Sequence, residues 1–295
     1  MRTPSFDYQL AVIGSGPSGQ RAAIQAAKLG KSVAIIERAR SVGGICVNFG
    51  TIPSKTFREA VMHLSGYRER GIYGSSYRVK QDIVIEDLLF RVDQVVRSEI
   101  DVIRNQMARN RVELIEATAT FVDPHLLELS TATGHGKRQI TAEKIVIACG
   151  TEAARDPHIP FDGQRVFTSD DVLGLRRLPR SIIVVGAGVI GVEYASMFAA
   201  LGVRVTIVDK RPVLLPFLDH EVSAALTYVL QQSNVTMRLG EEVADIHIRD
   251  ELSKPVEVRL KSGKMLHAEA ALYSIGRVGA TDRMQLGNAG VKVDD

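Results

Sequence analysis

Two glycine-rich turns are the parts of this chain best suited to chemistry. Both read G-x-G-x-x-G: Gly14, Gly16 and Gly19 in the first, and Gly186, Gly188 and Gly191 in the second. In such a turn the first glycine permits a tight bend, the second lets a pyrophosphate approach the backbone, and the third lets a helix pack closely on a strand. Free N–H groups at the start of the following helix would then bind the phosphate oxygens.

Each turn lies in the same sequence context. A β-branched run precedes it, an alanine-rich run follows it, and a second apolar run ends on an acid, Glu37 in one copy and Asp209 in the other. The distance from the first glycine to the acid is the same in both copies, and an acid there accepts hydrogen bonds from an adenosine ribose. The repeat predicts two dinucleotide sites and electron transfer between two cofactors, although two structural turns without a ligand are the alternative.

Residues 41–55, which read SVGGICVNFGTIPSK, add a further motif. The order GSGPSG, Glu37, GGxCxNxGxIPSK and GAGVIGVE resembles the flavoprotein disulfide reductase family over essentially the whole chain. The resemblance implies an α/β fold of two Rossmann-like domains, similar to glutathione reductase, with the second nested in the first and a β-meander in each. It implies an FAD-binding domain at 1–150, an NAD(P)-binding domain at 151–275, and the start of the return to the FAD domain at 276–295. Because the family continues further, we expect a truncated chain that lacks the C-terminal dimerisation domain.

The redox segment departs from the pattern of the disulfide reductases. The resemblance implies a redox-active pair of cysteines next to the flavin, but here Cys46 occupies the first position and Thr51 the second. A disulfide needs two thiols, and the resemblance places Cys149 by the adenosine side of FAD. Dithiol exchange is therefore not expected.

The same segment resembles the transhydrogenase branch of the family, which shares the string GTIPSK. The strings FVDPH from Phe121, EYAS from Glu193 and FLD from Phe217 resemble that branch too. The resemblance implies an NAD(P)+ transhydrogenase of the Si-specific type, in which NADPH reduces FAD and NAD+ then takes the hydride, in ping-pong order at one nicotinamide site. An atypical dihydrolipoamide dehydrogenase-like reductase and a non-catalytic nucleotide-binding fragment are the alternatives.

The predicted catalytic residues are Lys55, Glu193, Cys46 and Thr51. The resemblance places Lys55 near flavin N5 and pairs it with Glu193, where a cation would stabilise the negative charge of reduced flavin. The carboxylate would orient the lysine and offset its burial cost. A solvated lysine and an unrelated glutamate are the alternative, as is a packed Cys46 without chemistry.

In the second repeat, the residues at and just after the end of the second apolar run favour NAD in part and NADP in part. Asp209 favours a free 2′-OH, whereas Lys210 and Arg211 follow immediately and a guanidinium can bind a phosphate in bidentate fashion. This mixture suits an enzyme that accepts NAD and NADP(H) in turn, and a solvated turn is the alternative.

The cofactor-binding residues expected from the motifs and the resemblance fall into two groups. The FAD group is Gly14, Ser15, Gly16, Pro17, Ser18, Gly19, Glu37, Arg38, Gly43, Gly44, Ile45, Cys46, Lys55, Ala119 and Gly150. The NAD(P) group is Gly186, Ala187, Gly188, Val189, Ile190, Gly191, Glu193, Asp209, Lys210, Arg211, Gly276 and Arg277.

Several further elements must position these residues. Residues 84–110 predict a long helix with Leu88, Val92, Val102, Ile103 and Met107 among the residues of its apolar face. Residues 111–150 predict a small antiparallel meander, with a polar turn at 133–137 and a closing strand at 144–149. Residues 243–275 repeat that pattern, with a turn at 261–263.

Composition limits the class of protein. The chain has 295 residues, 45% of them hydrophobic, and a net charge of +3 without a basic block, so two domains and no nucleic-acid partner are expected. Its apolar runs are shorter than the roughly 20 residues that cross a bilayer, and its histidines lack metal-ligand spacing, so no membrane and no metal are expected. We expect a cytoplasmic protein. The resemblance implies small-molecule nucleotide substrates and full-length relatives that are homo-oligomers.

Overall fold

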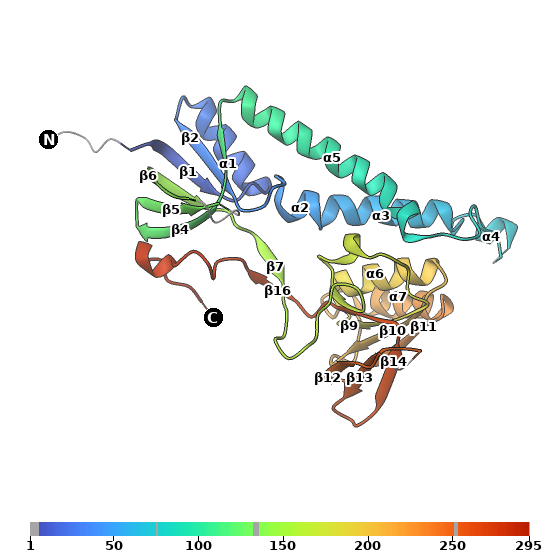
Figure 1. Cartoon of the computed structure of the whole chain (residues 1–295). Helices are drawn as coiled ribbons and strands as arrows, with labels where there is room; N and C mark the ends of the chain where they lie inside the picture. The colour runs from blue at the N-terminus through green and yellow to red at the C-terminus, as the bar shows by residue number, and fades with distance from the viewer. Residues whose placement is uncertain (1–5, 75, 132–135, 251–252, 295) are drawn as a thin grey trace. The chain divides into compact units, whose positions relative to one another are not determined.

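The structure is a computed structural model that describes residues 6–74, 76–131, 136–250 and 253–294 (Figure 1). The chain forms two compact units. The first unit consists of Met1–Pro53, Asp93–Glu152 and Val278–Asp295, and the second of Ser54–Val92 and Ala153–Arg277. The second unit is therefore inserted twice into the sequence of the first, and residues 54–92 group with it.

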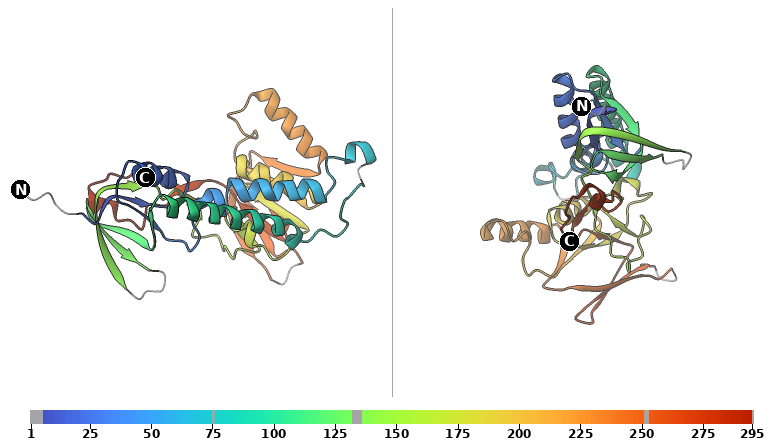
Figure 2. Two further views of the ribbon diagram at one scale, coloured as in Figure 1. Left: turned by 90° about the horizontal axis from the view of Figure 1, so that it is seen from above. Right: turned by 90° about the vertical axis from the view of Figure 1, so that its left-hand side faces the viewer.

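The first unit is built on one six-stranded sheet. Its strands are β1 (Tyr8–Ile13), β2 (Val33–Glu37), β3 (Glu113–Glu116), β4 (Thr118–Asp123), β5 (Leu126–Ser130) and β6 (Lys137–Ile147), in the order β3-β2-β1-β6-β5-β4. The second half of β6 pairs parallel with β1, whereas its first half pairs antiparallel with β5. One long strand thus joins the parallel sheet to the expected meander, the green strands of Figures 1 and 2. Residues 133–135 of the expected turn lie outside the described residues.

In the described part of the chain, five helices precede the meander. They are α1 (Pro17–Lys28), α2 (Gly44–Asn48), α3 (Thr51–Leu64), α4 (Arg70–Tyr73) and α5 (Ile85–Arg109). The long helix expected over 84–110 is confirmed as α5, but the placement of Val102 on its buried face is wrong because that side chain is 45% exposed. The buried stripe runs through Leu88, Val92, Ile103 and Met107, and Val102 lies about 100° from Ile103 around the helix axis.

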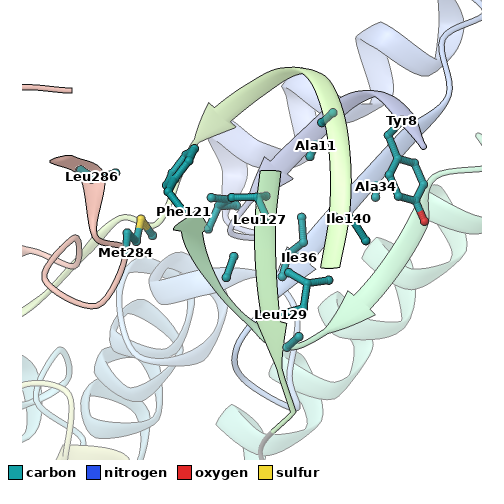
Figure 3. Packing of buried hydrophobic residues seen from close by; sticks show 14 residues of the cluster. Tyr8, Ala11, Ala34, Ile36, Phe121, Leu127, Leu129, Ile140, Met284 and Leu286 are labelled. Carbon is teal, nitrogen blue, oxygen red and sulfur yellow. The ribbon is translucent and has the colours of Figure 1, made fainter. Parts of the chain in front are cut away.

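The core of the first unit combines segments that are far apart in the sequence. Met284 and Leu286, from the returning segment 278–295, belong to the same buried cluster as Ile36, Phe121 and Leu127 (Figure 3). The backbone is tied as well, because the Phe121 N–H donates to the Met284 carbonyl at 2.9 Å. The returning segment, with the short helix η2 (Leu286–Ala289), therefore completes the core beside β4.

The second unit holds a parallel sheet and a separate meander. The parallel strands are β8 (Val166–Thr168), β9 (Ser181–Val185), β10 (Arg204–Asp209), β11 (Val235–Leu239) and β15 (Ala270–Tyr273), in the order β11-β10-β9-β15-β8. The meander strands are β12 (Val243–Ile248), β13 (Val256–Leu260) and β14 (Met265–Ala268), and the expected turn at 261–263 lies between the last two. The helices that connect the parallel strands are α6 (Val189–Ala200) and α7 (His220–Gln232), with the short η1 (Val172–Gly174) before β9.

Two short strands, β7 (Thr151–Ala153) and β16 (Arg277–Gly279), pair where the chain passes between the units. Within the second unit, Asp170 accepts both guanidinium nitrogens of Arg277, at 2.7 and 3.1 Å, and the Ala153 N–H at 3.2 Å. Burial opposes the charged form of Asp170, but the hydrogen bonds from Arg277 outweigh it, so the pKa of this carboxyl lies below its usual value. Asp170 thus binds both Ala153, where the chain enters this part of the second unit, and Arg277, where it leaves.

The third glycine of each turn gives a test of local packing. A Cβ on Gly19 would overlap the Gly14 carbonyl oxygen, and one on Gly191 would overlap the Gly186 carbonyl oxygen. We expect Gly19→Ala and Gly191→Ala each to lower the free energy of unfolding by about 1–3 kcal/mol in denaturant titrations. Gly71→Ala is the matched control, because a Cβ there meets nothing within 4 Å. Equal stability of all three variants would contradict this steric role.

The lowered pKa of Asp170 predicts a pH dependence of stability. A carboxyl whose pKa is lower in the folded state stabilises the fold above its unfolded pKa of about 3.9, and this contribution is lost as the pH falls through the folded pKa. At pH 7 we expect Asp170→Asn to reduce the free energy of unfolding by about 2 kcal/mol. The difference from the unaltered chain should shrink below about pH 4. The exposed Asp93→Asn is the control, and a constant difference at all pH values would refute the assignment.

Candidate functional site

The first glycine-rich turn is held against its sheet by the backbone. The Gly14 N–H donates to the Ile36 carbonyl at 2.8 Å, and a Cβ on Gly14 would overlap the Ala148 carbonyl, so only glycine fits its positive φ of 105°. Gly16 precedes the first residue of α1, and a Cβ there would lie no closer than 4.0 Å to any group, the nearest being Gly44. The turn therefore leaves open space beside its second glycine.

Glu37 links three loops at the end of β2. One carboxylate oxygen accepts the Ser15 N–H at 2.9 Å and the Ser15 hydroxyl at 2.6 Å, and the other accepts the Ala39 N–H at 3.0 Å. The Ser15 hydroxyl oxygen in turn accepts the Gly43 N–H at 3.0 Å. The glycine-rich turn, the acid and the redox segment are thus fixed relative to one another within the first unit.

A cavity of about 620 Å³ lies along this edge of the first unit. Of the residues predicted for FAD, those that line it are Gly14, Ser15, Gly16, Pro17, Ser18, Glu37, Arg38, Gly44, Ile45, Cys46, Ala119 and Gly150. Gly19 instead packs against Gly14, and Gly43 donates to Ser15. The cavity is also lined by Ala280, Thr281, Arg283 and Met284. The sequence did not indicate these residues, because they carry none of the glycine-rich or redox motifs.

The two cysteines both line this cavity and both are free thiols. Burial raises the pKa of the Cys149 thiol, which disfavours its thiolate. Thr51 is the exposed first residue of α3 and is not among the residues that line the cavity. Arg38 is half-exposed and forms an ion pair with Glu152 at 3.3 Å, a partner that no sequence motif indicated.

The turn of the second unit repeats the hydrogen bonds of the first. The Gly186 N–H donates to the Val208 carbonyl at 2.8 Å, and the Ala187 N–H donates to Asp209 at 2.6 Å, as Ser15 does to Glu37. Gly188 precedes the first residue of α6, and a Cβ there would meet nothing within 4 Å. At the start of α6, Val189 is exposed and Ile190 is partly exposed.

The two units differ in what else binds the acid. Arg211 clamps Asp209 through Nε to Oδ1 at 2.9 Å and Nη2 to Oδ2 at 2.6 Å, and the Arg211 N–H adds a bond at 2.8 Å. Burial opposes ionisation of Asp209, but the hydrogen bonds from Arg211 and Ala187 outweigh it, so the pKa of Asp209 lies below its usual value. Lys210 is exposed.

Both turns fit a pyrophosphate group. The second glycine of each has open space where a side chain would stand, and each precedes a helix of 12 residues whose N-terminal N–H groups can bind phosphate oxygens. The remaining predicted residues of the second unit, Gly276 and Arg277, are engaged elsewhere. The Gly276 carbonyl accepts the Ala154 N–H at 3.0 Å, and Arg277 binds Asp170.

Lys55 and Glu193 form an ion pair inside the second unit. The Lys55 Nζ donates to Glu193 Oε1, and the lysine side chain is 59% exposed while the glutamate is 19% exposed. Lys55 lies in the second turn of α3, and Glu193 is the fifth residue of α6. The structure thus brings these two residues together, and their action on a flavin stays a prediction.

Two classes of feature were not found in the part of the chain that the structure describes. In residues 6–74, 76–131, 136–250 and 253–294, no cluster of three or more histidine, cysteine, aspartate or glutamate side chains could hold a metal ion. Over the same ranges, no helix has both the length and the apolar character needed to span a bilayer.

Curated relatives align with nearly the whole chain. A protein named soluble pyridine nucleotide transhydrogenase from Mycobacterium bovis (strain BCG) is 52% identical over 287 residues, which are 97% of this chain and 61% of that protein. A protein of the same name from Colwellia psychrerythraea is 41% identical over 98% of this chain and 61% of its own length. The chain therefore spans about 61% of the length of these relatives.

Solved structures of other proteins resemble this chain over nearly its whole length. The HOCl-induced flavoprotein disulfide reductase RclA from Escherichia coli superimposes with a TM-score of 0.82 at 30% identity, over 98% of this chain and 61% of that one. LpdA from Mycobacterium tuberculosis gives a TM-score of 0.86 at 26% identity, over 97% of this chain and 62% of that one. The model of the pyridine nucleotide-disulphide oxidoreductase family matches residues 8–295. The chain belongs to the pyridine nucleotide-disulphide oxidoreductase family.

Proposed function

We propose that this chain is an NAD(P)+ transhydrogenase of the Si-specific type, which moves hydride from NADPH to NAD+ by way of FAD. The observation that carries the proposal is the pair of nucleotide-binding turns with matching hydrogen bonds, in a chain whose redox segment has one thiol. The names of the relatives at 52% and 41% identity support it. Those names also favour a soluble protein. A cytoplasmic location and a homo-oligomeric full-length form are part of the proposal.

In this proposal the first unit holds FAD and the second holds the nicotinamide nucleotide. FAD, when bound, accepts and returns the hydride. Glu37 offers its carboxylate to the adenosine ribose, and Gly16 lets the pyrophosphate approach the backbone. Gly188 and Asp209 have the corresponding tasks in the second unit. The chain supplies binding and orientation, because hydride transfer itself requires no acid or base.

The single thiol distinguishes this proposal from a disulfide reductase. Such an enzyme passes electrons from the flavin to a cysteine pair, but Thr51 carries no sulfur at the position of the second cysteine. The alternative function, disulfide reduction, has support from one solved structure, because RclA, at 30% identity, is named a disulfide reductase. With no second thiol in the segment, the electrons leave most directly to another nicotinamide, which is the transhydrogenase reaction.

The clamp of Arg211 on Asp209 supports the use of both nucleotides. A bare carboxylate would repel a 2′-phosphate, but the charge of Asp209 is neutralised by a bidentate guanidinium. Arg211 is 40% exposed, so it has room to turn toward a phosphate. In this proposal Asp209 accepts the free 2′-OH of NAD(H) once Arg211 moves, and Arg211 and Lys210 bind the 2′-phosphate of NADP(H).

An anaerobic titration tests the hydride transfer. The purified chain, supplied with FAD, is treated with NADPH and then with NAD+ while the flavin absorption band is followed. We expect NADPH to bleach the band and NAD+ to restore it, because each nicotinamide exchanges hydride with the flavin. A yellow protein that NADPH does not bleach, or a chain that binds no FAD, would refute the proposal. The second outcome would favour a nucleotide-binding fragment without activity.

The Arg211 clamp predicts a change in nucleotide preference. In Arg211→Ala we expect the Kd of NADPH to rise about tenfold and that of NADH to change by less than about threefold, because only NADPH loses a phosphate contact. The measurement is a binding titration with each nucleotide. Arg204→Ala is the matched control, since Arg204 is an exposed arginine at the start of β10, the strand that ends at Asp209 just before Arg211. Equal weakening of both nucleotides would instead show that Arg211 only positions Asp209.

A further inference from the structure

Arg70 is a partly buried cation that the proposed reaction does not use. One guanidinium nitrogen, Nη2, donates to the Ser65 carbonyl at 3.0 Å and to the Ala200 carbonyl at 3.1 Å. Its carbon Cζ lies 5.4 Å from the ring centre of Tyr67, in a cation–π contact. Among the described residues, no carboxylate oxygen lies within ion-pair distance of Arg70. Burial, and then the nearby Arg78, lower the pKa of this guanidinium.

Such an arrangement is costly. Nε of Arg70 is buried, and among the described residues it has no hydrogen-bond partner. A buried donor without a partner costs on the order of 1–3 kcal/mol, and a cation without a carboxylate loses hydration that no ion pair offsets. The two carbonyls that Arg70 binds, together with the Tyr67 ring, must therefore offset this cost.

Those two carbonyls belong to the ends of two different helices. Ser65 directly follows the last residue of α3, and Ala200 is the last residue of α6. The carbonyl ends of helices carry partial negative charge, so a cation shared between two such ends is stabilised by both. Arg70 thus acts as a common C-terminal cap that fixes the end of α3 to the end of α6.

The same two helices carry the Lys55–Glu193 pair near their other ends. Along α3, Lys55 lies about 15 Å before Ser65, and along α6, Glu193 lies about 10 Å before Ala200. Their N-terminal parts are joined by the ion pair and their C-terminal ends by Arg70, so the helices run in the same direction. Parallel helix dipoles repel each other, and the cation at the shared negative end offsets this repulsion.

The ion pair alone is a weak constraint. An ion pair with a half-exposed lysine contributes about 0–1 kcal/mol to stability, and the long lysine side chain stays free to move. The backbone bonds of Arg70, in contrast, fix the separation and register of the helices that carry the pair. We propose that Arg70 is a positioning residue, which holds α3 against α6 so that Lys55 meets Glu193. The importance of that pair to catalysis rests on the proposed function, whereas the positioning itself does not.

Chemical labelling of lysines tests the positioning without any flavin. The full chain is treated with a limiting amine-reactive reagent, and the rate of modification at Lys55 is read by mass spectrometry. An ammonium held against a carboxylate is less available to the reagent, so Glu193→Gln gives the rate for a broken pair. We expect Arg70→Met to raise the Lys55 rate by about two- to fivefold, to the level of Glu193→Gln.

Three comparisons separate positioning from general destabilisation. The rate at the exposed Lys28, on α1 of the first unit, should stay unchanged in Arg70→Met. Arg68→Met, two residues away and exposed, should leave the Lys55 rate unchanged. Adding Glu193→Gln to Arg70→Met should raise the Lys55 rate no further, because the pair is already broken.

The conservative variant Arg70→Lys keeps the proposal testable if Arg70→Met does not fold. A lysine retains the charge but lacks the planar fork, so we expect an intermediate Lys55 rate. An unchanged Lys55 rate in either folded variant, with or without a lower melting temperature, would overturn the positioning role. Because the readout is the labelling of one lysine, failure here leaves the flavin titration unaffected, and failure of that titration leaves this result unaffected.

Discussion

The edge of each unit that carries a glycine-rich turn depends on one hydrogen bond between a carboxylate and the backbone of that turn. Ser15 donates its N–H to Glu37 at 2.9 Å, and Ala187 donates its N–H to Asp209 at 2.6 Å. In each case the bond ties the residue after the first glycine to the end of the neighbouring strand. The turn can then remain bare at its second glycine, because the acid beside it and the close packing of the third glycine fix its shape.

The two copies diverge at the same carboxylate. In the first unit a hydroxyl, that of Ser15, completes the partners of Glu37, whereas in the second a guanidinium clamps Asp209. A hydroxyl is neutral and small, so it leaves the charge of the acid available to a ligand. A guanidinium cancels that charge and can itself bind an anion. The repeated motif thus presents two different electrostatic surfaces, because the residues next to each acid differ.

Sequence reasoning succeeded where structure is determined by neighbouring residues. The turns, the strands that flank them and the long helix α5 follow from local periodicity and glycine spacing. Contacts between distant segments were not accessible in the same way. Nothing in the sequence around Arg70 indicated that it binds the end of α6, and Met284 gave no sign that it packs beside Phe121. The position of Val102 was also predicted wrongly, because this apolar residue faces solvent although its neighbour Ile103 is buried.

The dependence of the first core on the returning segment has a consequence for biosynthesis. Met284 and Leu286 complete a core whose other residues lie between Tyr8 and Ala142, and residues 153–277 separate the two parts. At a translation rate of about 5–20 residues per second, the ribosome needs on the order of ten seconds to make that stretch. During that interval the apolar surface beside Phe121 and Leu127 lacks the cover of Met284 and Leu286, and exposed apolar surface of this kind favours aggregation.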